Sequence, residues 1–153
     1  MNQQRRDVMR ISTVLGLAFS AGILTPADVF AAEWSSKVFD AKTLEDAVKA
    51  LGANGFAMST DVLITAPDIA ENGAVVPITM ISKLPHTEYM AILVEKNPNA
   101  MAASFNLAPG TEPFINTRVK MGGTSNVYAL VKADGKWAAA SKEIKVTLGG
   151  CGG

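Results

Sequence analysis

The sequence contains a single cysteine, which lies between two pairs of glycines in the motif Gly149-Gly150-Cys151-Gly152-Gly153. Glycine lacks a Cβ atom and opens most of φ/ψ space, so a segment of this composition predicts a mobile arm rather than part of a core. Such a backbone is also thin enough to enter a narrow channel. Fully extended, five residues span roughly 17 Å, at about 3.3–3.6 Å per residue. The motif therefore predicts a swinging arm that carries a thiol.

The thiol of Cys151 has no catalytic partner near it in the sequence. No lysine or arginine lies within residues 149–153, and the one histidine, His86, belongs to the distant segment Leu84-Pro85-His86-Thr87. An unperturbed thiol has a pKa of about 8.5, so roughly a few per cent of it is thiolate at neutral pH. We therefore expect Cys151 to be a covalent attachment point that is activated inside another protein's active site, and we expect no catalytic residue in this chain.

Other roles for a lone cysteine fit the sequence less well. A cysteine among four glycines has no interior to enter, and a disulfide within the chain needs a second cysteine. An unpaired cysteine indicates a reactive thiol or an intermolecular disulfide, and both stay open. One histidine, one cysteine and no clustered carboxylates argue against a metal site, so we expect neither a metal nor another cofactor. We expect His86 in a turn, and Asp68, Glu71 and Glu88 as solvated charges.

The elements that must hold this arm begin with one short helix. Thr43 can cap its first turn, with Asp46 three residues later as a variant of the capping box. One apolar stripe recurs at i, i+3, i+4 and i+7: Leu44, Ala47, Val48 and Leu51. Gly52 then supplies the left-handed position that ends a helix. The pattern predicts a surface helix packed onto the domain.

After the helix the pattern changes to about seven short strands with a turn signal roughly every ten residues. The predicted strands cover residues 62–64, 74–81, 88–95, 101–107, 117–121, 126–133 and 136–148. Asp134-Gly135 is a strong hairpin signal, and Glu71-Asn72-Gly73 predicts a turn. Pro77 cannot donate to a ladder, so its strand is expected at a sheet edge or with a bulge. This spacing predicts an all-β fold, an immunoglobulin-like antiparallel β-sandwich of about seven strands.

Residues 1–31 have the three parts of an export signal. Arg5, Arg6 and Arg10 supply positive charge, residues 11–24 are uncharged and mostly apolar, and small residues permit cleavage after Ala31 or Ala32. The segment 5–10, RRDVMR, resembles a twin-arginine signal, with an ordinary export signal and an uncleaved anchor as alternatives. We therefore expect a periplasmic protein with three parts: an export signal at 1–31, the sandwich domain at 32–148 and the arm at 149–153.

Cleavage after Ala31 leaves 122 residues, which is enough for one hydrophobic core. The remaining chain has eleven basic and twelve acidic side chains, so its net charge is about −1. The sequence contains no basic patch and no second apolar segment long enough to span a bilayer. We therefore expect neither nucleic acid nor a membrane as a partner.

Taken in this order, these features resemble the SoxY family of sulfur-oxidation carrier proteins. Residues 64–78, with the sequence ITAPDIAENGAVVPI, resemble the strand-turn-strand hallmark of that family. Residues 149–153 match its substrate-carrying motif, and the twin-arginine-like signal opens the chain. The resemblance covers essentially the whole chain, with Gln4 and Met9 of the signal as minor departures.

The resemblance implies a periplasmic carrier of the thiosulfate-oxidising system that is not itself an enzyme. Cys151 would carry thiosulfate as an S-thiosulfonate and then other sulfur adducts, including a persulfide, on the flexible arm. The chain would form a heterodimer with a second small β-sandwich protein, SoxZ, and the two would be exported together in the folded state. The c-type cytochrome SoxAX, the manganese-dependent hydrolase SoxB and, where present, the sulfane dehydrogenase SoxCD would act on the arm.

Two other classes of protein fit parts of the sequence. A ubiquitin-like sulfur carrier also ends in Gly-Gly, but it needs cytoplasmic adenylation and a β-grasp domain, which the signal and the strand order oppose. An exported immunoglobulin-like binding module with an incidental reactive cysteine fits the signal and the fold, but it gives the glycine-flanked thiol no task. Intact mass spectrometry of protein from cells exposed to thiosulfate would separate the carrier from both.

Overall fold

The computed structural model describes residues 36–147 of the 153-residue chain, and all of them belong to a single structural unit. The predicted export signal at 1–31 and the predicted arm at 149–153 lie outside the described residues. Two helices come first, α3 (Ser36–Phe39) and α4 (Leu44–Ala50). The strands of the described part are β1 (Ala57–Met58), β2 (Val62–Thr65), β3 (Ile69–Ala70), β4 (Val76–Ser82), β5 (Thr87–Val94), β6 (Met101–Asn106), β7 (Phe114–Val119), β8 (Ser125–Ala133) and β9 (Lys136–Val146).

The strands form two sheets, which confirms the predicted all-β, immunoglobulin-like sandwich. The larger sheet has the strand order β1-β9-β8-β5-β6, with β3 paired to β9 beside that path, and the smaller sheet has the order β2-β4-β7. The long ladders are antiparallel, whereas β1 and β3 make short parallel pairs with β9. The seven predicted strands correspond to β2 and to β4 through β9. The periodicity does not predict β1 and β3, because two residues are too few to show a period.

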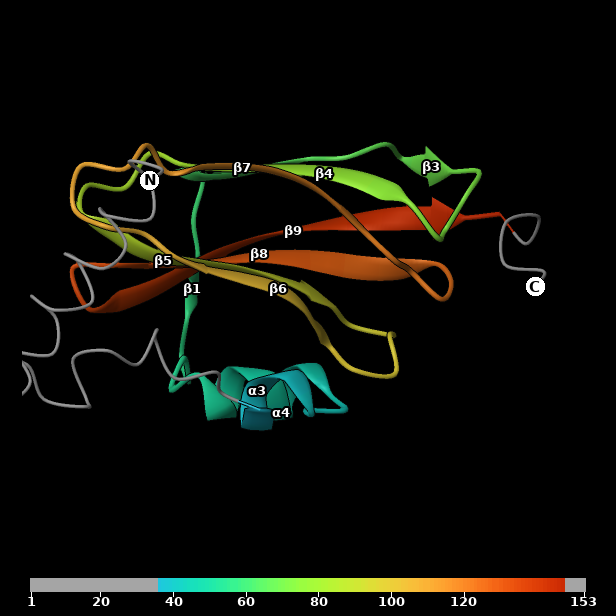
Figure 1. Cartoon of the computed structure of the whole chain (residues 1–153), viewed down its shortest axis with the longest axis horizontal. Coiled ribbons are helices and arrows are strands. Elements are labelled where there is room, and N and C mark those ends of the chain that lie inside the picture. Colours follow the sequence, from blue (N-terminus) through green and yellow to red (C-terminus); the bar gives the residue numbers. More distant parts are fainter. Residues whose placement is uncertain (1–35, 148–153) are drawn as a thin grey trace, which may run out of the picture. The chain divides into compact units, whose positions relative to one another are not determined.

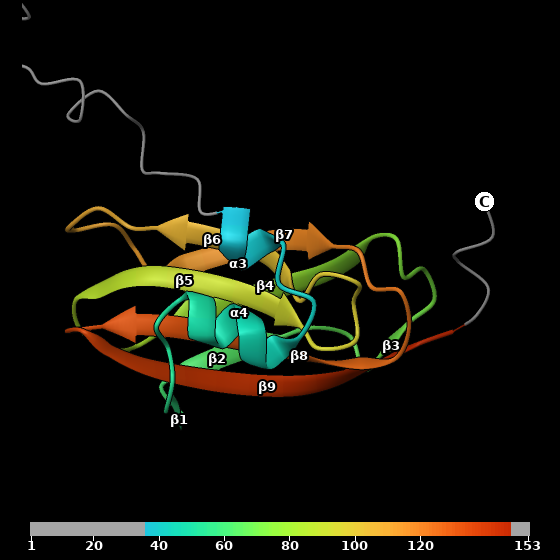
Figure 2. The same ribbon diagram turned by 90° about the horizontal axis from the view of Figure 1, so that it is seen from below.

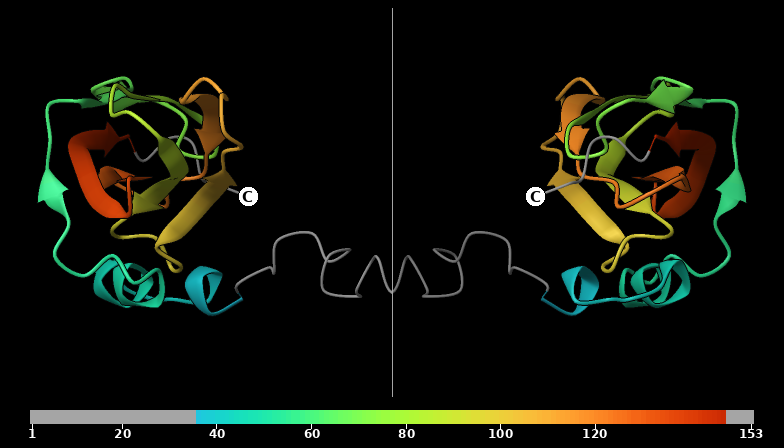
Figure 3. Two further views of the ribbon diagram at one scale, coloured as in Figure 1. Left: turned by 90° about the vertical axis from the view of Figure 1, so that its left-hand side faces the viewer. Right: turned by 90° about the vertical axis from the view of Figure 1, so that its right-hand side faces the viewer.

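The larger sheet is the middle of three layers, with the smaller sheet on one face and the helices on the other (Figures 1 and 3). The sequence of strand β5 explains why this sheet lies in the middle. Met90, Ile92 and Val94 belong to the core cluster between the sheets, whereas Ala91 and Leu93 belong to the cluster under the helices. Because both faces of β5 are covered, its end is a continuous apolar run rather than an alternation.

Helix α4 forms where the sequence predicts it. Thr43 has an extended backbone, and its Oγ1 accepts a hydrogen bond from the Asp46 backbone N–H at 3.1 Å and lies 2.7 Å from Asp46 Oδ2. Gly52 follows the end of the helix with a φ of 68°, in the left-handed region. Ala47 and Val48 are buried against the larger sheet, which α4 crosses in Figure 2. Of the helices in the described part of the chain, none is long and apolar enough to cross a membrane.

The position of Pro77 differs from the expectation that its strand is an edge or carries a bulge. Strand β4 is the central strand of the smaller sheet, and its ladder with β7 is regular, so that expectation is wrong. The reason is the length of the neighbouring strand. The ladder with β2 begins only at Thr79, whereas the ladder with β7 includes the pair Pro77 and Arg118. At Pro77, which lacks an N–H, strand β4 is therefore paired on one side only, with β7.

The other local signals agree with the structure at turns, and the largest difference at a strand boundary is in β7. Asp134 and Gly135 have φ values of 47° and 72°, as a two-residue hairpin turn of type I′ requires. Strand β7 begins at Phe114 and ends at Val119, so it starts three residues and ends two residues before the predicted 117–121. Its start is set by pairing, because Phe114 is opposite Ile81 near the end of β4.

Candidate functional site

The candidate attachment residue Cys151 and the arm glycines Gly149, Gly150, Gly152 and Gly153 lie outside the described residues. The structure describes the chain as far as Thr147, four residues before Cys151. The surface around Thr147 is therefore the platform from which the arm leaves the sandwich.

The end of β9 is wrapped on one side by residues 68–75, which we call the arm-base collar. The backbone N–H of Lys145 donates to the Asp68 carbonyl oxygen at 2.9 Å, and the N–H of Thr147 donates to the Ala70 carbonyl oxygen at 3.1 Å. Between these bonds, β3 runs parallel to the last two residues of β9, as Figure 1 shows beside the red end of the strand. The collar therefore fixes the backbone up to the last described residue.

The connection between β7 and β8 holds the same strand end from another direction. The N–H of Val146 donates to Thr124 Oγ1 at 3.0 Å. The N–H of Met121 donates to the Gly73 carbonyl oxygen at 2.7 Å, which ties this connection to the arm-base collar. Two segments far apart in the sequence thus meet at the point where the arm begins.

Gly73 belongs to the predicted turn, but the turn is not what requires a glycine there. The turn is closed by Asn72, whose Oδ1 accepts a hydrogen bond from the Ala74 N–H at 2.9 Å, and Gly73 has no positive φ. A Cβ atom at Gly73 would lie 2.6 Å from the Met121 carbonyl oxygen and 2.8 Å from Val146 Cγ1. Glycine is required because the β7–β8 connection and β9 approach its backbone closely.

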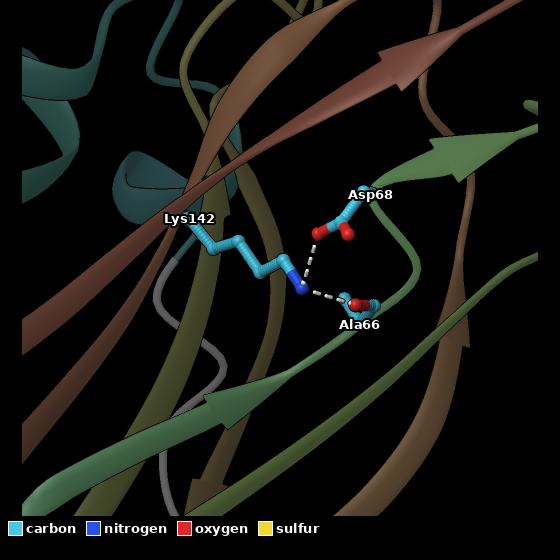
Figure 4. A network of polar contacts seen from close by, with 3 residues as sticks. All are labelled: Ala66, Asp68 and Lys142. Atoms are coloured by element: carbon cyan, nitrogen blue, oxygen red, sulfur yellow. Dashed lines mark hydrogen bonds and ion pairs between the residues drawn. The ribbon is translucent and has the colours of Figure 1, made fainter.

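A lysine from β9 connects the strand to the segment that leads into β3 (Figure 4). Lys142 Nζ lies 2.9 Å from Asp68 Oδ1 and also donates to the carbonyl oxygen of Ala66. The hydrogen bond from Lys142, and then its charge, hold the pKa of the exposed Asp68 carboxyl below its ordinary value. Asp68 is thus solvated, as expected, but it is also ion-paired.

The sequence singles out neither Lys142 nor Thr124 as a residue of this region. Lys142 falls at an ordinary polar position of an alternating strand, and Thr124 follows two glycines of a connection. Their partners are distant in sequence, so no local pattern reports them. The hallmark segment 64–78 is the one signal that points here, because it contains both Asp68 and Gly73.

The other candidate residues lie at the opposite end of β9. His86 is exposed in the turn between β4 and β5, with a φ of 50°, which confirms the expected turn. Glu88 pairs with Lys132 at 3.1 Å. A cavity of about 610 Å³ at this end is lined by His86 and Asp134 among others. Within residues 36–147, no group of three or more His, Cys, Asp or Glu side chains is arranged to hold a metal ion.

Comparison with known proteins connects this sandwich to a family. Residues 48–151 match the family model described as "Sulfur oxidation protein SoxY". The solved structure of the sulfur carrier protein SoxY from Chlorobium limicola f thiosulfatophilum is 37% identical, with a TM-score of 0.61, over 69% of this chain and 97% of that chain. None of the curated protein sequences gives a match.

A second group of solved structures shares the fold alone. Superoxide reductase (neelaredoxin) from Ignicoccus hospitalis is 18% identical, with a TM-score of 0.52, over 75% of this chain and all of its own length. Two variants of that protein give TM-scores of 0.51. At such low identity, these matches describe the architecture and nothing of the chemistry.

The fold and the platform at the end of β9 define a small immunoglobulin-like β-sandwich, with a cysteine placed shortly after its last strand. The family match covers most of the chain and includes that cysteine. The chain belongs to the SoxY family, and its role is that of a carrier protein in sulfur oxidation.

Proposed function

We propose that Cys151 is the covalent attachment point and that this chain carries thiosulfate-derived sulfur between enzymes without catalysing a step itself. The observation that carries this proposal is the extent of the family match, which runs through the sandwich and ends on Cys151, the one cysteine of the chain. The hydrogen bonds at the end of β9 support it, because they hold Val146 and Thr147, a few residues before Cys151, on the sandwich.

The proposed cycle balances atoms and electrons at the Cys151 sulfur. In the first step the thiol and thiosulfate form an S–S bond, which releases one proton and two electrons to a c-type cytochrome, SoxAX. Water then cleaves the terminal sulfonate as sulfate, in a hydrolysis that leaves a persulfide and needs no oxidant, on SoxB. A dehydrogenase, SoxCD, takes six electrons from the outer sulfur while three waters supply oxygen. A second hydrolysis releases sulfate and restores the thiol.

A covalent carrier suits this chemistry for a physical reason. The persulfide intermediate is reactive, and attachment to a protein prevents its loss between steps. Attachment also raises the effective concentration of the sulfur at each active site that the arm enters. Glycines on both sides of Cys151 add no side chain, so several unrelated channels could accept the same arm.

We further propose that the protein works in the periplasm as a heterodimer with SoxZ. The twin-arginine-like residues Arg5 and Arg6 support export in the folded state, together with a subunit that has no signal of its own. The free edges of the sandwich support a β-protein partner: β6 ends the larger sheet, and β7 ends the smaller one.

The test is intact mass spectrometry of protein from cells exposed to thiosulfate, together with a Cys151→Ser variant. Wild-type protein should carry added sulfur or sulfonate mass that a reductant removes, whereas Cys151→Ser should carry none and should support no thiosulfate oxidation. Ser141→Ala, at an exposed position of β9, is the matched control and should behave as wild type. Full thiosulfate oxidation by Cys151→Ser would rule out the carrier role of this residue.

A further inference from the structure

The chain contains two Asn-Gly dipeptides, Asn54-Gly55 and Asn72-Gly73, and both asparagine residues are exposed. An asparagine can react with its own backbone, because the nitrogen of the next residue can attack the side-chain carbonyl carbon. A following glycine favours this attack, since it has no side chain that blocks the approach and it allows many backbone conformations. The local sequence gives both sites the same reactive pair of residues, so a difference between them must come from the fold.

The fold leaves Asn54 and Gly55 free to react. They form the middle of the turn between α4 and β1, which is closed by a hydrogen bond from the Phe56 N–H to the Ala53 carbonyl oxygen at 3.2 Å. Within residues 36–147, no hydrogen bond holds the side chain of Asn54. Gly55 is exposed, and no atom lies within 4 Å of the position that its Cβ would take. The amide of Asn54 can therefore rotate towards the Gly55 nitrogen, and water reaches both groups.

The fold restrains the same two residue types at Asn72-Gly73. Asn72 Oδ1 accepts a hydrogen bond from the Ala74 N–H at 2.9 Å, which fixes the orientation of the side-chain amide. Gly73 is buried, and its carbonyl oxygen accepts a hydrogen bond from the Met121 N–H at 2.7 Å. A Cβ at Gly73 would lie 2.6 Å from the Met121 carbonyl oxygen and 2.8 Å from Val146 Cγ1, so its backbone has little room to turn. Ring closure at Asn72 would have to break the bond to Ala74 and move this crowded backbone.

We propose that Asn54 is a site of spontaneous covalent modification, deamidation, in the folded protein, and that the fold protects the same dipeptide at Asn72. The Gly55 nitrogen loses its proton and bonds to Asn54 Cγ, the Cγ–Nδ2 bond breaks, and the side-chain nitrogen leaves as ammonia. Water then opens the resulting succinimide ring at either carbonyl, which gives aspartate or isoaspartate. No electrons are exchanged, so water is the only co-reactant. The inference does not depend on the proposed sulfur-carrier role.

The two products of this reaction have different consequences at residue 54. Asn54 lines a cavity of about 630 Å³ whose charged lining residues are Lys132 and Lys136, so an aspartate there faces positive charge. Isoaspartate instead adds a methylene group to the main chain between Ala53, which is fully buried, and Phe56, which packs against the core cluster under the helices. The fold therefore tolerates the aspartate product, whereas the isoaspartate product strains the turn that leads from α4 into β1.

The test compares the two dipeptides within one chain. The purified full chain is incubated at mildly alkaline pH, folded in one series and unfolded in urea in the other, and peptide mapping by mass spectrometry measures deamidation at each site. In the folded chain Asn54 should react at least about tenfold faster than Asn72, because a hydrogen bond and a crowded backbone oppose the reaction only at Asn72. In urea the two rates should become similar. Asn54→Gln should remove most of the isoaspartate formed by the folded chain, whereas Asn72→Gln, the matched control, should remove little.

Three outcomes would overturn the inference. Deamidation of Asn72 in the folded chain as fast as that of Asn54 would show that the fold gives no protection. A rate difference that stayed the same in urea would attribute it to the flanking sequence and not to the fold. An Asn54 that reacted in urea but stayed intact in the folded chain would show that its turn is protected as well. If the Asn72→Gln variant folds poorly, the peptide map of the wild-type chain decides among these outcomes without it.

Discussion

Lys142 Nζ lies 2.9 Å from Asp68 Oδ1 and joins the last long strand to the segment that wraps its end. The same ammonium group donates to the Ala66 carbonyl oxygen, so one side chain fixes both ends of the short connection that leads into β3. Asp68 is also the first residue of the arm-base collar. The ion pair is therefore part of what keeps the collar against β9.

The first prediction concerns the pH dependence of this ion pair. The folded-state pKa of Asp68 is lowered from 3.8, because the ionised form accepts a hydrogen bond from Lys142. The ion pair therefore stabilises the fold above pH 3.8, and its contribution is lost as the pH falls through the lowered folded-state pKa. Asp68→Asn should slightly lower the urea midpoint at pH 7, and its difference from wild type should disappear in strong acid.

Glu71→Gln provides the control for that measurement. Glu71 is an exposed carboxylate three residues from Asp68, and no ion pair involves it within the described chain. Its urea midpoint should follow that of the wild type across the same pH series. An Asp68→Asn difference that persisted unchanged in strong acid would mean that the loss is steric and not electrostatic. A small effect is expected in either case, because exposed ion pairs contribute little to stability.

The second prediction concerns the close approach at Gly73. In Gly73→Ala, the new methyl group would meet the Met121 carbonyl oxygen at 2.6 Å, and a backbone oxygen cannot move aside as a side chain does. The variant should lose about 1–3 kcal/mol in free energy of unfolding, as overpacked sites do. Gly123→Ala is the control, because no atom lies within 4 Å of its added Cβ and its φ is not positive. Equal stability of the two variants in urea titrations would contradict the close contact.

The parts of the fold that the sequence predicts are those determined by local chemistry. Helix α4 was expected from Thr43 and Gly52, and the β8–β9 hairpin from Asp134 and Gly135, and each feature is present. The short strands β1 and β3 depend instead on their pairing with β9, which no local pattern contains. Pro77 shows the same limit, since its tolerance in a central strand depends on where β2 ends.

The candidate site likewise has one part that local sequence predicts and one part that depends on long-range contacts. Cys151 stands out because a lone cysteine among glycines needs no partner to be recognised. Its platform does not stand out, because each contact there joins residues far apart in the chain. Gly73 was expected to serve a turn, but its role is to let Val146 and Met121 approach. Only the folded arrangement gives that information.

The third prediction tests the helix that covers the larger sheet. Thr43→Ala removes the acceptor of the hydrogen bond from the Asp46 N–H, so it should reduce the free energy of unfolding by about 1 kcal/mol. Thr111→Ala, at an exposed loop position, is the control and should be neutral within roughly 0.5 kcal/mol. Thermal unfolding monitored by circular dichroism compares the two. Identical midpoints for the two variants would argue that the cap contributes nothing.

The fourth prediction concerns export. Replacing Arg5 and Arg6 by lysine should leave the precursor in the cytoplasm, because a twin-arginine signal depends on both guanidinium groups. Arg10→Lys makes the same chemical change outside the pair and should be exported normally. The mature wild-type protein should begin at Ala32 or Glu33 when its N-terminus is sequenced. Normal export of the double variant would exclude the twin-arginine route but leave the carrier role intact.

The last prediction separates access of the arm from chemistry of the thiol. Glycines next to Cys151 add no side chain, so the motif suits a narrow channel, and a bulky neighbour should collide with the channel wall. Gly150→Phe and Gly152→Phe should therefore lower enzymatic sulfate release from the loaded arm by at least about tenfold, an energetic loss of about 1.4 kcal/mol. In free solution both variants should react with an alkylating agent at nearly the wild-type rate, since no channel is involved. Gly150→Ala is the small control and should retain most of the turnover. Turnover by the phenylalanine variants at the wild-type rate would show that no narrow channel receives the arm, and slow alkylation in free solution would attribute the defect to the thiol itself.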